Sequence, residues 1–134
     1  METVRKVDYF VMQVANKPGE AVRVLEAVRN VNLLAFTGFP NGKRSQVDFI
    51  PEDAAAFKAA AKRAKLKVKP KKGGYLIQGD DRAGALQDVM QRLASAKVNV
   101  TAIDAVSAGG GRYGAVLWVK PKDVNKAAKA LGAM

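Results

Sequence analysis

A repeat of about 65 residues constrains this chain more than any other feature of its sequence. In each copy an apolar stretch ends in a polar loop with a glycine, and residues at helical spacing follow. A Val-Asn pair then opens the next apolar stretch. Gly19 and Gly84 occupy the same place in the two copies, 65 residues apart, and Asn32 and Asn99 follow at a spacing of 67. We therefore expect the two halves to fold alike.

Alternating and helical patterns predict the order β-α-β-β-α-β in the first half and β-α-β-β-α in the second. The second half shows no last strand, so we expect another segment to cover that edge. The chain is predicted to be α+β, with two units at residues 1–72 and 73–134, antiparallel sheets, and helices on one face of each. The predicted strands are 7–14, 32–39, 45–50, 66–69, 75–79, 98–106 and 113–119. The predicted helices begin at residues 20, 51, 84 and 121. We expect hairpin turns at 40–43 and 109–111, and a link between the two units at 71–74.

The composition argues against several classes of protein. The chain has no His and no Cys, which removes the usual zinc ligands, imidazole bases and thiolate nucleophiles. We expect no enzyme activity, no cofactor and no metal. No apolar run approaches the ~20 residues that a membrane-spanning helix needs. With no signal-peptide pattern either, we expect a cytoplasmic protein that does not contact membranes.

The charge is strongly positive and unevenly placed. The net charge is +11, and residues 1–72 carry 15 Lys and Arg against 7 Asp and Glu. Eight of these cations lie between Lys58 and Lys72, a stretch without an acidic residue. A solvated surface explains such a run, and so does a surface for a polyanion. The alternative function is therefore nucleic-acid binding through the strip Lys58–Lys72.

Three further motifs are weaker. Gly109–Gly114 matches G-x-G-x-x-G, but a strand follows it where dinucleotide binding needs a helix, so a hairpin turn explains it. Gly111–Trp118 partly matches the basic-glycine-aromatic signature of RNA-recognition domains, yet Ala115 stands where a second aromatic would stack on a base. Asp80 and Asp81 could bind a hard cation, although two adjacent carboxylates without a third acid nearby are more often a solvated loop or a helix cap.

The loop that contains each repeated glycine is the strongest candidate site. A glycine at the start of a helix lets a ligand approach the backbone. The free N–H groups of the first helical turn can then hold a carboxylate. A tight turn that needs only small residues is the structural alternative. The occurrence of the element in both halves favours a binding site.

The segments Asn16–Gly19 and Val31–Leu33, with their counterparts Asp81–Leu86 and Val98–Val100, resemble the ACT domain. This family has a ferredoxin-like fold, often occurs in tandem, and regulates other proteins by binding small molecules. Ala83 departs from the pattern, since proline stands at this place in the first copy. The resemblance implies two ferredoxin-like units and a non-catalytic regulatory protein that binds a ligand, an amino acid. It also implies a homodimer and a target on a separate chain. The ligand-binding residues that it implies are Asn16, Lys17, Pro18, Gly19, Asn32, Asp81, Arg82, Ala83, Gly84 and Asn99.

Overall fold

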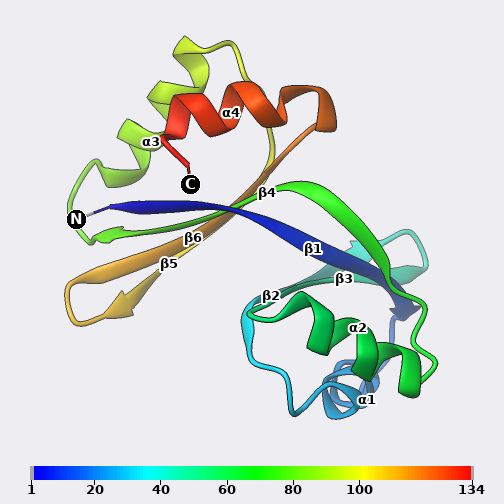
Figure 1. The fold of residues 1–134 in the computed structure, drawn as a ribbon. Coiled ribbons are helices and arrows are strands. Elements are labelled where there is room, and N and C mark those ends of the chain that lie inside the picture. Colours follow the sequence, from blue (N-terminus) through cyan, green and yellow to red (C-terminus); the bar gives the residue numbers. More distant parts are fainter. Residues whose placement is uncertain (1, 134) are drawn as a thin grey trace. The chain divides into compact units, whose positions relative to one another are not determined.

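The computed structural model describes residues 2–133 and contains the same series of elements twice (Figure 1). The series is strand, helix, strand, strand, helix. The first copy comprises β1 (Thr3–Ala15), α1 (Glu20–Ala27), β2 (Leu33–Asn41), β3 (Arg44–Pro51) and α2 (Ala54–Arg63). The second comprises β4 (Lys69–Asp80), α3 (Ala85–Ser95), β5 (Val100–Gly109), β6 (Arg112–Val119), the short 3₁₀ helix η1 (Pro121–Asp123) and α4 (Val124–Leu131).

The strands follow the order β2-β3-β1-β4-β6-β5, with hydrogen bonds between neighbours. Pairing is antiparallel between β1 and β3, β2 and β3, β4 and β6, and β5 and β6. The fold is therefore α+β with an antiparallel sheet, as predicted.

The chain divides into two compact units. The first unit is Asp8–Lys71, and the second unit joins the residues up to Val7 to those from Lys72 onward. The division predicted from the sequence assigns all of residues 1–72 to one unit. The structure instead gives the start of β1 to the second unit.

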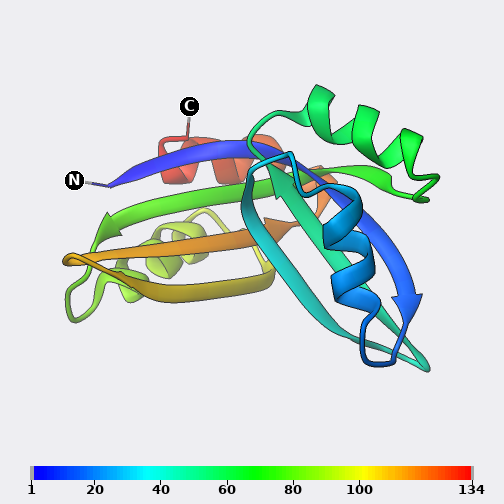
Figure 2. The same cartoon turned by 90° about the horizontal axis from the view of Figure 1, so that it is seen from below.

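The start of β1 takes the place of the last strand that the second half was predicted to lack. In the second unit the strand order is β1-β4-β6-β5, and Figures 1 and 2 both show the first part of β1 running beside β4. Val4 is 4% exposed and packs in the same core as Tyr75, Ile77 and Leu117. A ferredoxin-like unit places its last strand beside its first. The second unit is thus completed by a segment that precedes the first unit in the sequence.

Each unit has its own core between strands and helices. In the first unit, the ring centroids of Phe10 and Phe57 lie 4.8 Å apart and those of Phe49 and Phe57 lie 5.0 Å apart. Such contacts add to the stabilisation that area burial gives. In the second unit, buried residues of α3 and α4, such as Val89 and Leu131, pack on the alternate residues of β4 and β6 that point to one face. The helices of the second unit therefore cover one side of its strands.

The predicted edge strand at 66–69 and link at 71–74 are wrong. Residues 66–68 form no strand, because Lys65 adopts a left-handed φ of 59° and the Leu66 N–H donates to the Ala61 carbonyl at 2.9 Å, which terminates α2. Strand β4 then runs without a break from Lys69 through the glycines. Gly73 has a φ of 98°, and a Cβ at this position would lie 2.7 Å from the Val119 carbonyl oxygen. The glycine thus permits a close approach to the end of β6 and does not form a flexible link.

The predicted helix starts at 51 and 121 also need correction. Pro51 is the last residue of β3, and Asp53 caps α2 by accepting a hydrogen bond from the Ala56 N–H at 3.1 Å. A side-chain cap of this kind accepts a hydrogen bond from a first-turn N–H that has no acceptor within the helix. Pro121 begins the 3₁₀ helix, and α4 follows from Val124. The two predicted hairpin turns, at Gly42 and at Gly110–Gly111, are confirmed.

Candidate ligand pockets

Each unit has a helix that begins at a left-handed glycine. Gly19 precedes α1 with a φ of 89°, and Gly84 precedes α3 with a φ of 82°. Residues with a Cβ rarely adopt this conformation. Among the described residues, neither helix has a side-chain hydrogen bond at its N-cap. The first N–H groups, of Glu20 and Ala85, donate to the Lys17 and Arg82 carbonyls at 3.4 and 3.3 Å. The next two N–H groups of each helix have no recorded acceptor in the described part of the chain and remain available to a ligand.

The first pocket lies where the β1–α1 loop faces the later part of β2. Its volume is about 290 Å³. Asn16 and Lys17 come from the loop, and Phe36 and Phe39 supply aromatic surface from β2. Inside this pocket, the Glu20 carboxylate accepts two hydrogen bonds from Arg23, at 2.9 and 2.8 Å. The remaining lining residues are Val14, Ala15, Ala21, Gly38, Pro40, Ser45 and Val47.

The second pocket occupies the corresponding place in the second unit and has a volume of about 390 Å³. Asp81 and Arg82 come from the β4–α3 loop and Ser107 comes from β5. The Ser107 hydroxyl donates to the Asp81 carboxylate at 2.8 Å. Tyr113 of β6 lines the pocket as well. The start of α3 and the neighbouring residues of β5 complete it: Gly84, Ala85, Leu86, Gln87, Ala105 and Val106.

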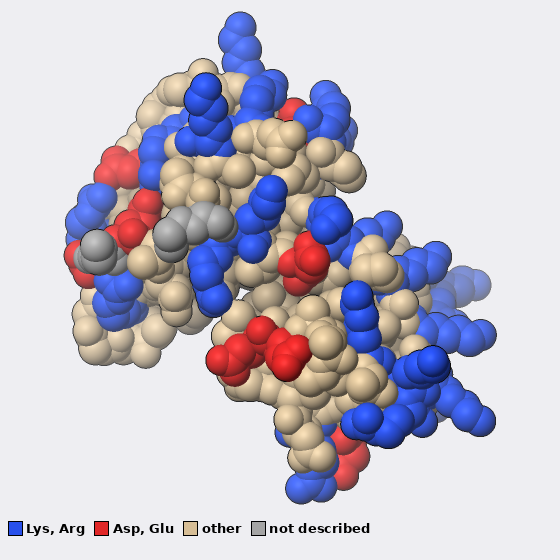
Figure 3. Space-filling model, in the orientation of Figure 1, with Lys and Arg blue, Asp and Glu red and all other residues tan. Residues whose placement is uncertain are grey.

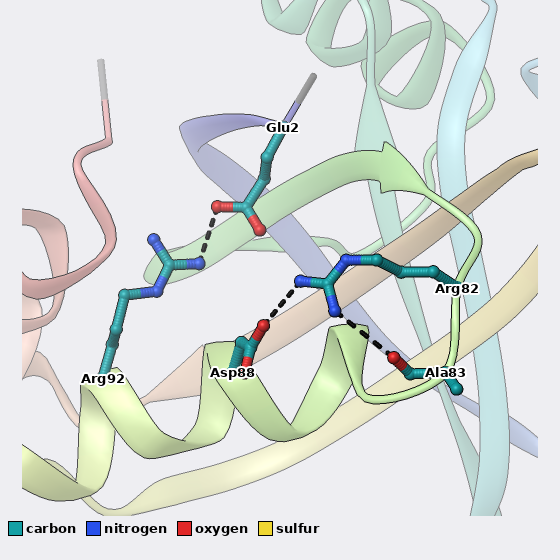
Figure 4. Close-up of polar contacts among 5 residues, drawn as sticks. All are labelled: Glu2, Arg82, Ala83, Asp88 and Arg92. Atoms are coloured by element: carbon teal, nitrogen blue, oxygen red, sulfur yellow. Dashed lines mark hydrogen bonds and ion pairs between the residues drawn. The ribbon is translucent and has the colours of Figure 1, made fainter.

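An ion pair holds the arginine of the second pocket in place (Figure 4). Arg82 donates to the Asp88 carboxylate at 2.5 Å and to the Ala83 carbonyl at 3.3 Å. The hydrogen bond to Asp88 raises the pKa of Arg82 further above its ordinary value, so the guanidinium keeps its charge. Arg92 forms a separate pair with Glu2 at 2.6 Å. The loop before α3 therefore presents a charged guanidinium beside the second pocket.

Comparison with known proteins was informative only at the level of structure. No protein-family model matches the chain, and no curated protein matches it. Protein BT0572 of Bacteroides thetaiotaomicron is similar in structure, with a TM-score of 0.81 at 20% identity over 96% of this chain and 88% of that one. The regulatory subunit of aspartate kinase from Thermus thermophilus gives a TM-score of 0.66 at 15% identity, over 98% and 94%. A putative C-terminal regulatory domain of aspartate kinase from Porphyromonas gingivalis W83 gives 0.55 at 11% identity, over 98% and 94%.

The chain shares its fold with these proteins.

The predicted site residues fall into two groups. Five of them line the pockets: Asn16, Lys17, Asp81, Arg82 and Gly84. Pro18, Gly19 and Ala83 belong to the same loops without lining the pockets.

The structure does not bring Asn32 or Asn99 to either pocket. The Asn32 side-chain amide donates to the Glu52 carboxylate at 3.1 Å, and the Glu52 N–H donates to the Asn32 carbonyl at 2.9 Å. Asn99 is exposed just before β5. Both asparagines precede their strands, whereas the pocket residues lie in the later parts of β2 and β5. A strand rises about 3.3 Å per residue, so several residues of strand separate each asparagine from its pocket.

Sequence reasoning missed the contributions of β2, β5 and β6 to the pockets. The available signal was topological. Strands β1 and β2 are both antiparallel to β3, so they are parallel to each other. The loop after β1 and the end of β2 must then lie at the same edge. The same argument places Ser107, near the end of β5, beside the loop after β4.

Other kinds of site are not seen in the described residues. Within residues 2–133, no three acidic side chains gather where they could hold a metal ion. Asp80 is paired with Arg112 at 2.8 Å, and Asp81 with Ser107. In the same part of the chain, no helix is long and apolar enough to cross a bilayer.

Proposed function

We propose that this protein is a non-catalytic regulatory protein that binds a small molecule, an amino acid, in the pockets before α1 and α3. The observation that carries the proposal is the repeated pocket, in which an uncapped helix start faces the end of a strand in both units. Helix N-termini attract carboxylates through free N–H groups and the helix dipole. The similarity to a regulatory subunit of aspartate kinase over most of both chains supports a regulatory role.

A thermal-shift screen against the twenty amino acids tests this function. A ligand that binds only the native state at ~100 times its Kd adds ~2.7 kcal/mol, which raises the Tm by several degrees for a protein of this size. We expect at least one amino acid to give such a shift. Gly84→Val is the test variant, because a branched side chain is strained at a φ of 82° and faces the loop. Gly132→Val is the control, since Gly132 also has a positive φ, of 68°, and it lies at the end of α4, which lines neither pocket. A flat screen would contradict the proposal.

We also propose that the protein forms a homodimer and acts on a target on a separate chain. Strands β2 and β5 lie at the two ends of the strand order, where each has a free edge. Phe39 of β2 is 45% exposed and Val106 of β5 is 69% exposed. Exposed apolar side chains beside a free strand edge suit pairing between copies. Sedimentation that shows a monomer at all concentrations would contradict the dimer.

A second candidate function, nucleic-acid binding, is favoured by the surface of α2 and the start of β4. Seven Lys and Arg side chains between Lys58 and Lys71 are exposed. No ion pair joins them to another residue of the described chain, whereas Arg23 and Arg29 of α1 pair with Glu20 and Glu26. Figure 3 shows cations gathered over the part of the surface that carries α2. Unpaired lysines of this kind can contact phosphates without reading sequence.

Salt dependence distinguishes this second function. If the basic surface binds duplex DNA, its affinity falls steeply with salt, with a slope of log K on log salt of about −0.9 per phosphate contact. Lys62→Glu with Lys67→Glu should then abolish binding. Lys126→Glu with Lys129→Glu on α4 provides the control for charge. Equal loss in both double variants would mean that net charge alone produces the binding.

A further inference from the structure

A groove between the two helices of the second unit, the α3–α4 groove, is lined by cations. Its volume is about 530 Å³, and three of its lining residues are Arg92 of α3 and Lys126 and Lys129 of α4. In the described part of the chain, no acidic residue lines it. Figure 3 shows cations over the part of the surface that carries α4. The other lining residues are small or uncharged: Gln91, Ser95, Ala96 and Ala130.

The helices themselves explain these cations only in part. Arg92 and Lys129 lie in the last turns of α3 and α4, where a cation offsets the helix dipole. Lys126 lies in the first turn of α4, where the dipole disfavours a cation. Its ammonium is 3.9 Å from the Asp123 carboxylate, and its side chain is 56% exposed. An exposed pair of this kind contributes little to stability, so the stability of α4 does not explain Lys126.

Arg92 is held at the groove by two contacts. Its guanidinium donates to the Glu2 carboxylate at 2.6 Å (Figure 4) and to the Leu131 carbonyl at 3.5 Å. A guanidinium carries five N–H donors, so donors remain for a further acceptor. Because the two contacts fix the side chain, less entropy is lost when it binds another group. Lys129 forms no ion pair with another described residue.

The floor of the groove suits an apolar side chain. Ala96 and Ala130 are partly buried and pack against the core of the second unit. Packed helices lie about 8–10 Å apart, depending on the side chains between them, so alanines let a third helix come close. An amphipathic helix buries its apolar face in a groove of this kind. A phosphate backbone has no apolar face to bury, so the groove favours a helix of a protein over a nucleic acid.

A second copy of this chain is a poor occupant of the groove. The net charge of the chain is +11, so two copies repel each other at a cationic surface. Four of its carboxylates are already paired with arginines of the same chain: Glu20, Glu26, Asp80 and Asp88. The complementary charge therefore has to come from a different protein.

We propose that the separate target chain docks in the α3–α4 groove through an amphipathic helix that carries acidic residues on both sides of a short apolar face. The acidic residues pair with Arg92, Lys126 and Lys129. The apolar face covers Ala96 and Ala130. This inference rests on the proposed function, since it assumes that the protein acts on another chain.

Amide NMR of the full chain with a synthetic helical peptide tests the inference. The peptide has alanine and leucine along one face and glutamate on both sides of it. The Ser95, Ala96 and Ala130 amides should shift and saturate. Replacing the glutamates of the peptide with glutamines should weaken binding about tenfold, because charge-assisted contacts are lost. A peptide of the same composition with its leucines spread around the helix should also bind about tenfold more weakly, because it has no apolar face to bury.

Two double variants test the surface on the protein. Lys126→Glu with Lys129→Glu reverses two exposed cations of the groove and should weaken binding of the acidic peptide at least about tenfold. Lys62→Glu with Lys67→Glu in the first unit is the matched control, because it changes the net charge equally at exposed positions outside the groove. It should leave binding of the peptide unchanged. All four lysines are exposed, so both variants should fold.

Three results would overturn the proposal. The first is the absence of saturating shifts at Ser95, Ala96 and Ala130. The second is equal weakening in both double variants, which would leave net charge as the only cause. The third is saturation of the same amides by duplex DNA at a lower concentration than by the peptide, which would make the groove a nucleic-acid surface.

Failure of this inference can be told from failure of the proposed function. If an amino acid raises the Tm while the peptide leaves the groove amides unshifted, the ligand-binding function stands and the docking groove is refuted. If the peptide saturates the groove amides while the amino-acid screen is flat, the groove is supported and ligand binding is refuted.

Discussion

Replacing Val4 with aspartate should lower the free energy of unfolding of the second unit by at least ~3 kcal/mol. Val4 is 4% exposed and packs against the core of the second unit, although it lies more than 60 residues before the rest of that unit in the sequence. A carboxylate there must be buried without a partner or must displace the strand. Amide hydrogen exchange should show protection lost at Tyr75, Ile77 and Leu117.

Arg5→Asp is the control for this variant, because Arg5 is exposed on the neighbouring position of the same strand. It changes the charge by more than Val4→Asp does, yet it should change stability by no more than ~0.5 kcal/mol. If Val4→Asp were as mild as Arg5→Asp, the start of β1 would not complete the core of the second unit.

Gly73→Ala should destabilise the second unit by about 2–4 kcal/mol, measured by chemical denaturation. Two costs add at this position. The backbone has a φ of 98°, which disfavours any residue with a Cβ, and the Cβ would lie 2.7 Å from the Val119 carbonyl oxygen. Because the contact is with backbone, β4 and β6 must separate locally to relieve it.

Gly42→Ala separates these two costs. Gly42 has a φ of 65°, and a Cβ there would meet no atom within 4 Å. Gly42→Ala should therefore lower the free energy of unfolding only by the cost of the positive φ, about 1–2 kcal/mol. Equal losses in the two variants would show that Gly73 is needed for its φ alone and that the approach to Val119 is not limiting.

Most of the elements could be predicted from the sequence because their signals are local. Helix α1 begins at Glu20 as predicted, and the Asn41-Gly42 turn joins β2 to β3. The pairing of the start of β1 with β4 in the second unit could not be predicted from such local signals. Thr3–Val7 contains two adjacent basic residues and has a weak strand pattern, and its partner strand begins at Lys69. A pairing across that distance leaves no local mark in the chain.

Only the loops of the candidate site could be predicted from the sequence. Asn16, Lys17, Asp81 and Arg82 lie in loops that the repeat identifies, and they line the pockets. The opposite wall comes from the later parts of β2 and β5, which only the direction of the strands brings to that edge. The sequence predicts Tyr113 only as the first residue of a hairpin strand, since nothing in its neighbours indicates that its hydroxyl is buried without a hydrogen-bond partner among the described residues.

The most direct test of the central claim is to map where an amino acid that raises the Tm binds, by amide chemical shifts of the full chain. We predict saturating shifts that are confined to the pocket loops and helix starts, at Asn16–Ala21 or Asp81–Gln87, and that are lost in Gly84→Val if the second pocket binds. Shifts on α2 or the start of β4, with both loops unmoved, would contradict it and place the binding surface among the exposed lysines.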